Sequence, residues 1–171
     1  LTLTLTLTLT LTLTLTTQAV AEFYGEFFSN HDLESFFNEI GEPRQSIPQA
    51  NVKGNLPNDQ GHAGGEASLD VQYLMGMAPE VPTYFYSYSD LNPYTPENEG
   101  FLTWLVTMAG EQNPPLVHSL SYGDVEADVF NSTNGAAPYA ARVDLEFAKL
   151  SARGMSNPNP NPNPNPNPNP N

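Results

Sequence analysis

The sequence contains no cysteine and few basic residues, and each shortage excludes a class of protein. Without cysteine there can be no disulfide framework, no cysteine-ligated zinc and no thiol nucleophile. Only 5 lysines and arginines stand against 19 aspartates and glutamates, which gives a formal net charge of -14. Nucleic-acid partners are therefore not expected, because phosphate contacts require clustered basic side chains. No apolar run is long enough to span a bilayer, so no membrane partner is expected either.

The two ends of the chain are low-complexity repeats. Residues 1–16 alternate Leu and Thr, and residues 157–171 alternate Asn and Pro. Asn-Pro repeats cannot form a regular ladder and are expected to be disordered. Different frames of one DNA hexamer, CCCTAA, can encode both repeats, so we interpret them as translated repeat DNA and as artefactual protein sequence. The first repeat also lacks the basic start and the continuous apolar core of a signal peptide.

Residues 17–156 form the remaining segment, which has the length of one domain or of part of a larger one. Apolar spacing predicts alternating helices and strands, which favours an α/β fold with a mostly parallel sheet flanked by helices. The predicted helices cover residues 18–28, 29–41, 66–79, 97–110 and 138–153, and the predicted strands cover residues 83–88 and 116–121. Ser29 and Gly41 are expected to cap the second helix. Pro, Gly and Asn between the second and third helices predict a long loop with one short strand.

Glu66 and Asp70 are four residues apart near the start of the helix that follows a Gly-rich loop. This spacing puts both carboxylates on one helical face, where contact would split their proton affinities and leave one as a usable acid or base. A purely electrostatic role is an alternative, because acidic residues in the first turns complement the helix dipole. A retaining glycosidase is another, since it uses carboxyl groups about 5 to 5.5 Å apart. The spacing by itself leaves all three open.

Three further features bear on function. Ser121, Tyr122 and Gly123 end the last predicted strand, where α/β enzymes commonly place substrate contacts. Asn131 begins the sequon Asn-Ser-Thr, which permits N-glycosylation and a secretory route. The histidines lack a second His or an acid at ligand spacing, so surface or core roles are predicted for them and metal binding is not; they are His31, His62 and His118.

Several blocks, in order, resemble the serine-carboxyl peptidases, the sedolisin family, and in particular its tripeptidyl-peptidase branch. The blocks are residues 23–40, Glu66-Ala-Ser-Leu-Asp70-Val-Gln-Tyr-Leu-Met, Phe101-Leu-Thr-Trp-Leu, Val117-His-Ser-Leu-Ser-Tyr-Gly-Asp-Val-Glu126 and Lys149-Leu-Ser-Ala-Arg-Gly154. The resemblance implies a truncated subtilisin-like fold, with residues 17–156 as the N-terminal part of the catalytic domain. It also implies that Glu66 is the general base, that Asp70 holds and tunes it, and that Ser121, Tyr122 and Gly123 line the substrate cleft.

The same resemblance implies peptide or protein substrates and activity at acidic pH, in a secreted or lysosome-like compartment. A carboxylate with an ordinary pKa of about 4 can act as a base in acid, where a histidine would be protonated. The family's Gly-Thr-Ser nucleophile run and its Ser-Gly-Asp-Ser-Gly oxyanion stretch do not occur in these 171 residues. The family's calcium site lies near its C-terminus, outside this chain, so no cofactor is expected. The chain alone is therefore expected to be inactive, and a non-catalytic remnant or peptide-binding module is the alternative.

Overall fold

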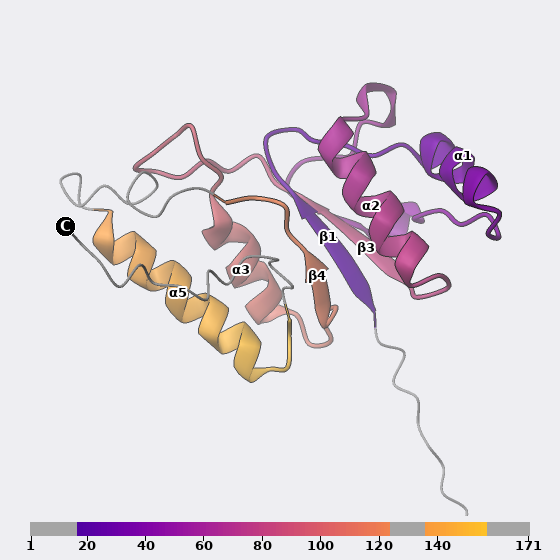
Figure 1. Cartoon of the computed structure of the whole chain (residues 1–171). Coiled ribbons are helices and arrows are strands. Elements are labelled where there is room, and N and C mark those ends of the chain that lie inside the picture. The colour runs from indigo at the N-terminus through magenta and orange to yellow at the C-terminus, as the bar shows by residue number, and fades with distance from the viewer. Residues whose placement is uncertain (1–16, 124–135, 157–171) are drawn as a thin grey trace, which may run out of the picture.

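The computed structural model describes residues 17–123 and 136–156, which build a four-stranded sheet with helices on both faces (Figure 1). The strands are β1 (Gln18–Glu22), β2 (Val52–Gly54), β3 (Thr83–Ser87) and β4 (Val117–Ser119), all parallel and in the order β2-β3-β1-β4. The helices are α1 (Asn30–Ile40), α2 (Gly65–Met77), α3 (Phe101–Gly110) and α5 (Ala137–Ala152), with the short 3₁₀ helices η1 (Gln49–Asn51) and η2 (Gln60–His62). The predicted α/β fold, with a parallel sheet flanked by helices, is confirmed.

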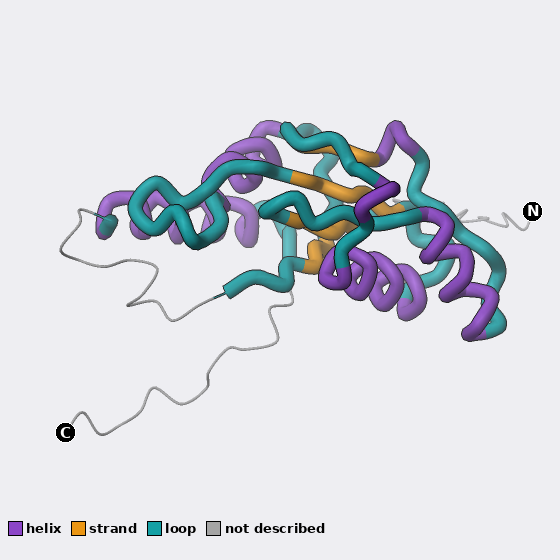
Figure 2. Tube along the Cα trace, turned by 90° about the horizontal axis from the view of Figure 1, so that it is seen from above, coloured by secondary structure: helices purple, strands orange, loops and turns teal. Residues whose placement is uncertain are grey.

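Two hydrophobic clusters cover the two faces of the sheet, and the view from above shows the strands between the helical layers (Figure 2). On one face Val20 and Phe85 pack against α1 and α2. On the other face Ala21 and Tyr86 pack against α3 and α5. This division follows from the pleat, because successive side chains of a strand point to opposite faces.

The strand β1 replaces the helix that was predicted over residues 18–28, so that prediction is wrong. All five residues of β1 are buried, because the strand lies between β3 and β4 and is covered on both faces. Central parallel strands are apolar on both faces, and periodicity cannot distinguish them from a buried helix. Tyr24 and Gly25 follow with φ angles of 58° and 76°, which a right-handed helix cannot accommodate.

The ends of α1 agree with the sequence-based prediction. The Ser29 hydroxyl accepts a hydrogen bond from the Asp32 amide at 3.2 Å, and Gly41 ends the helix with a φ of 77°. Both caps supply partners to backbone groups that the helix itself leaves unpaired. The two predicted caps are confirmed.

The helix α3 begins at Phe101, four residues later than predicted. Leu91 and Glu99 form an antiparallel bridge, and the Gly100 amide donates to the Asp90 carbonyl at 3.0 Å. These contacts close the segment after β3 into a loop, so residues 97–100 form a turn that leads to the bridge residue Glu99 instead of a first helical turn. Likewise β4 ends at Ser119, two residues before the predicted end.

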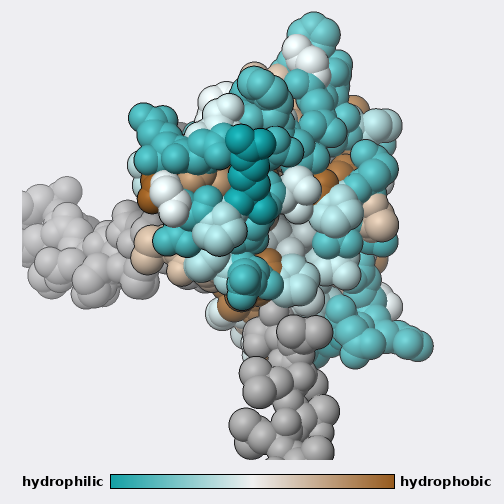
Figure 3. Space-filling view, turned by 90° about the vertical axis from the view of Figure 1, so that its right-hand side faces the viewer, coloured by the Kyte–Doolittle hydropathy of each residue, from teal (hydrophilic) through white to brown (hydrophobic). Residues whose placement is uncertain are grey.

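The surface of the described residues is mostly hydrophilic on the side that Figure 3 shows, with smaller hydrophobic patches between the polar side chains. Within residues 17–123 and 136–156, no helix is long and apolar enough to cross a membrane. The predictions for residues 1–16, Asn131 and residues 157–171 lie outside the described residues.

Candidate active site

The carboxyl ends of β1, β3 and β4 meet at one edge of the sheet, because all of the strands are parallel. Glu22 ends β1, Ser87 ends β3, and Ser121 to Gly123 follow β4. In open α/β sheets this edge is where ligands bind. The helix α2, which carries Glu66 and Asp70, packs on the face of the sheet that Val20 and Phe85 form.

Asp70 contacts the residues that follow β4. Its carboxylate accepts hydrogen bonds from the Ser121 hydroxyl, at 2.7 Å to Oδ1 and 2.6 Å to Oδ2, and from the Ser119 hydroxyl at 3.1 Å. Asp70 is 8% exposed, whereas Ser121 is on the surface. The structure therefore brings together two of the residues that the sequence singled out, one on α2 and one after β4.

Glu66 lies one helical turn before Asp70, in the first turn of α2, and is partly exposed. The Glu66 side chain forms no hydrogen bond with Asp70 or with any other described residue. The partners of Asp70 are serine hydroxyls, so the direct contact between the two carboxylates that the spacing suggested is not formed. A partly exposed carboxylate without partners at the edge of the sheet is free to accept a proton from a bound group.

Tyr122 and Gly123 differ in their surroundings. The Tyr122 ring meets Phe23 edge-on at 5.1 Å between centroids, and its hydroxyl lies 2.9 Å from the Glu22 carboxylate. Burial, followed by the charge of Glu22, raises the pKa of Tyr122. Gly123 is exposed, and a Cβ added to it would meet nothing within 4 Å. In the predicted substrate-binding segment, the side chains of Ser121 and Tyr122 are thus both held by hydrogen bonds, and Gly123 is exposed.

Glu22 is a residue of this site that sequence analysis missed. Its side chain is 0% exposed, and burial raises its pKa from 4.5 to about 8. The Tyr122 hydrogen bond opposes this shift, and the charges of Asp70, Glu66 and Glu26 add to it. The available signal was a carboxylate within a largely apolar run, in the segment that was predicted to be helical.

Glu26 fills the space beside the loop that leads into α2. A Cβ built on Gly64 would overlap the Glu26 carboxylate, and the Gly64 amide donates to the Phe27 carbonyl at 2.8 Å. A carboxylate at the start of a helix is favoured by the helix dipole. The glycine before α2 therefore makes room for an acidic side chain next to Glu66.

Removal of the Asp70 carboxylate tests the contact between α2 and the residues after β4. We expect Asp70→Ala to lower the free energy of unfolding by about 2 kcal/mol, because hydrogen bonds to a charged group are lost in a nearly buried place. The control is Asp144→Ala, which removes an exposed carboxylate from α5 and should change stability by less than about 0.5 kcal/mol. Urea denaturation measures both, and equal losses would contradict the predicted role of the Asp70 contacts.

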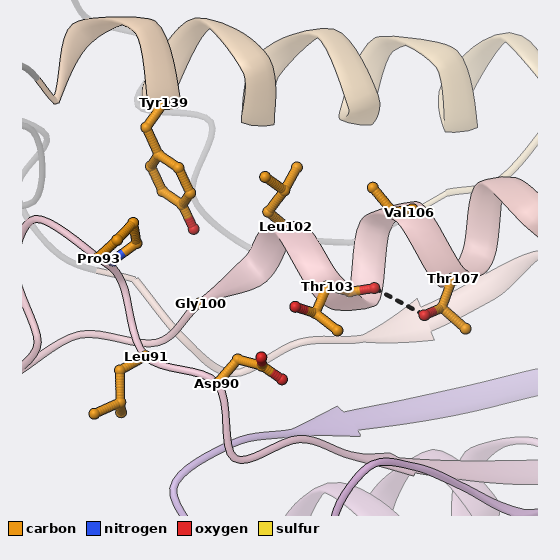
Figure 4. A pocket seen from close by; sticks show the side chains of 9 residues that line it. All are labelled: Asp90, Leu91, Pro93, Gly100, Leu102, Thr103, Val106, Thr107 and Tyr139. Carbon is orange, nitrogen blue, oxygen red and sulfur yellow. Dashed lines mark hydrogen bonds between the residues drawn. The ribbon is translucent and has the colours of Figure 1, made fainter.

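A pocket of about 430 Å³ opens beside Asp70. Besides Asp70 and Ser119 it is lined by apolar side chains of α2, among them Tyr73 and Met77, which is 84% exposed. A second pocket of about 460 Å³ lies between the loop after β3, α3 and the start of α5 (Figure 4). Asp90 and Tyr139 contribute to the second pocket, but none of the predicted site residues lines it. Of the site carboxylates only Asp70 lines the first pocket, and we place the candidate site where that pocket meets Asp70 and the residues after β4.

The acidic residues of this site are not arranged as a metal centre. Among the residues that the structure describes, no group of three or more His, Asp or Glu side chains is placed to hold a metal ion. The charges of Asp70 and Glu66 instead add to the burial that raises the pKa of Glu22.

Comparison with known proteins finds relatives over most of the chain. The chain is 43% identical over 139 residues to tripeptidyl-peptidase 1 of Dictyostelium discoideum, and this match covers 81% of the chain and 21% of the relative. It is 37% identical over 142 residues to tripeptidyl-peptidase 1 of Rattus norvegicus and of Homo sapiens, which covers 82% of the chain and 23% of each relative. No family model matches the chain.

The chain spans less than a quarter of the length of these relatives. The similar stretch nevertheless has the length of the whole segment between the two terminal repeats. Over 82% of its length the chain is homologous to a part of tripeptidyl-peptidase 1, a protein of the sedolisin family.

Proposed function

We propose that residues 17–156 are part of the catalytic domain of an acid-acting serine-carboxyl peptidase and that Glu66 is its general base. The observation that carries this proposal is the pair formed by a partner-free Glu66 and an Asp70 that is held by the residues after β4. The homology to tripeptidyl-peptidase 1 supports it. Peptides or proteins are then the substrates, from which it removes tripeptides or which it cleaves internally, and an acidic secreted or lysosome-like compartment is the place of action.

Each carboxylate has a separate role in this proposal. Glu66 takes the proton of the attacking serine hydroxyl, which a carboxylate can do at a pH where imidazole is protonated. Asp70 stays anchored to the Ser121 hydroxyl one helical turn from Glu66, and in this proposal it holds and tunes the general base. No cofactor takes part in these steps.

The segment from Ser121 to Gly123 is proposed to bind the substrate main chain. Ser121 and Gly123 are exposed, and Tyr122 anchors the segment through its hydroxyl and ring. An exposed extended segment that follows an edge strand offers backbone donors and acceptors to a peptide, which can pair with it as an added strand. Pairing of this kind uses main-chain hydrogen bonds, which a peptide can supply, and requires no basic side chain in the site.

A chimera tests the proposed function. Residues 17–156 would replace the corresponding stretch of the Dictyostelium discoideum tripeptidyl-peptidase 1, and release of tripeptides from a peptide amide would be measured near pH 4. We expect activity in the chimera and a loss of about a hundredfold or more with Glu66→Gln, since general bases contribute 10² to 10⁴ in rate. A matched control is Glu42→Gln, which neutralises an exposed carboxylate after α1. A folded chimera that is inactive, or one that Glu66→Gln leaves unchanged, would refute the proposal.

The 171-residue chain alone is expected to bind peptides without cleaving them, because it holds no Gly-Thr-Ser run. A general base without a nucleophile cannot start acyl transfer. This second candidate, a peptide-binding module, predicts saturable binding of a peptide amide near pH 4 and no turnover.

A further inference from the structure

Glu22 occupies an unusual place for a carboxyl group. It ends the central strand β1 and lies opposite Ser87 in the register with β3. Its side chain is completely buried, and its Oε1 atom has no hydrogen-bond partner among the described residues. Buried carboxyl groups are rare unless they are paired or serve a function.

The Tyr122 hydroxyl makes three contacts, and whether all three can be hydrogen bonds at once depends on whether Glu22 is protonated. Its oxygen lies 2.9 Å from Glu22 Oε2, 3.0 Å from the Phe23 amide nitrogen and 3.1 Å from the Phe23 carbonyl oxygen. The hydroxyl has a single proton to donate. If Glu22 is ionised, that proton goes to its carboxylate, and the contact with the Phe23 carbonyl is lost.

A neutral Glu22 satisfies all three contacts at once. Its Oε2–H donates to the Tyr122 oxygen, the Tyr122 hydroxyl donates to the Phe23 carbonyl, and the Phe23 amide donates back to the Tyr122 oxygen. The tyrosine oxygen then accepts two hydrogen bonds and donates one, which is its full capacity. The geometry therefore fits the protonated form of Glu22 better than the ionised form.

The charges around Glu22 act in the same direction. The groups whose charges reach it are Asp70 and Glu66 on α2 and Glu26 in the loop after β1, and all three are acidic. The neighbouring Tyr122 contributes a hydrogen bond and no cation. Together with burial these groups raise the pKa of Glu22 to about 8.

We propose that Glu22 is a positioning residue of the candidate site, which as a neutral acid fixes Tyr122 and thereby holds the peptide-binding segment beside Asp70. The chain of contacts runs from Glu22 to Tyr122, then to Ser121 and to the Asp70 carboxylate. Because Glu22 is neutral, it anchors this segment without adding a third negative charge beside Glu66 and Asp70. The inference rests on the proposed function only in that it calls residues 121–123 a peptide-binding segment. The contacts that support it, and the experiment that tests it, do not require catalysis.

Carboxyl-carbon NMR titration of the 171-residue chain tests the proposal directly. We expect the side-chain carboxyl of Glu22 to titrate near pH 8, and the backbone amide of Ser121 to report the same transition through Tyr122. Glu22→Gln, which keeps a neutral hydrogen-bonding group, should leave the Ser121 amide signal at pH 5 unchanged and abolish its shift near pH 8. Tyr122→Phe should uncouple Ser121 from Glu22 as well.

The results that would overturn the proposal are equally specific. They are a Glu22 carboxyl that titrates at its ordinary value of 4.5, or a Ser121 amide that does not follow Glu22. A merely structural role of Glu22 would give no transition at Ser121, so the pH profile separates the two roles. If Glu22→Gln does not fold, titration of the unmodified chain still decides. Peptidase activity of the chimera is a separate measurement, so failure of the proposed function would leave this test valid.

Discussion

Gly54→Ala should lower the free energy of unfolding by about 3 to 5 kcal/mol, since it combines backbone strain with a steric overlap. Gly54 ends β2 with a φ of 105°, a conformation that favours glycine. A Cβ built there would overlap the carbonyl oxygen of Ser87 in the neighbouring strand β3. Because β3 is paired on both sides, by β1 and β2, its backbone cannot move away cheaply.

Gly41→Ala is the matched control for this substitution. Gly41 ends α1 with a φ of 77°, but a Cβ there would meet nothing within 4 Å. Only the left-handed conformation is penalised, which costs about 1 to 2 kcal/mol. Urea denaturation of the two variants and the unmodified chain measures the difference. Equal losses would show that the contact between β2 and β3 yields easily and would contradict the prediction.

Helix ends and turns were predictable where a local chemical signal exists. Ser29 and Gly41 provide such signals, and α1 has the predicted caps. The strand β1 shows the limit, because Gln18 to Glu22 is buried on both faces and its apolar side chains fit a buried helix equally well. What decides for a strand is pairing with residues 65 and 99 positions away, Gln18 with Thr83 and with Val117, which no local pattern contains.

The same distinction applies to the candidate site. Glu66 and Asp70 were singled out by their spacing on one helix and by the family resemblance, and Ser121 because it ends the last predicted strand. That Asp70 accepts hydrogen bonds from Ser119 and Ser121 depends on how β4 and α2 pack, 49 and 51 residues apart in the chain. Glu22 was missed because its importance arises from burial at the end of a strand that sequence analysis assigned to a helix.

Because of His118, the free energy of unfolding is expected to decrease as the pH falls. It is completely buried between Tyr86 and Trp104, and its Nε2 lies 2.9 Å from the Pro115 carbonyl oxygen. Burial lowers the pKa of His118 from 6.5 to about 4. The unfolded chain therefore binds a proton more readily, so stability is full above pH 6.5 and is lost as the pH falls towards 4. The loss amounts to about 3 kcal/mol at about 1.4 kcal/mol per pKa unit.

His118→Gln should remove this loss while it keeps an amide donor for the Pro115 carbonyl. The variant is expected to be less stable than the unmodified chain at pH 7, because the imidazole packs between aromatic rings, and this difference should shrink by about 3 kcal/mol between pH 7 and pH 4. His31→Gln is the control, since the His31 side chain is 89% exposed and should leave the pH profile unchanged. The measurement is the free energy of unfolding in urea at each pH. A profile of His118→Gln parallel to that of the unmodified chain would contradict the prediction.

Glu22 acts in the opposite direction, and the two groups together bound the pH range of the fold. The pKa of Glu22 is raised from 4.5 to about 8, so its favourable contribution is full below pH 4.5 and is lost as the pH rises through about 8. Between pH 4.5 and 6.5 the loss from His118 on acidification and the gain from Glu22 offset each other. We therefore expect these two groups to produce a plateau of stability in that interval. His118→Gln should replace this plateau by a rise in stability on acidification, and Glu22→Gln should replace it by a fall.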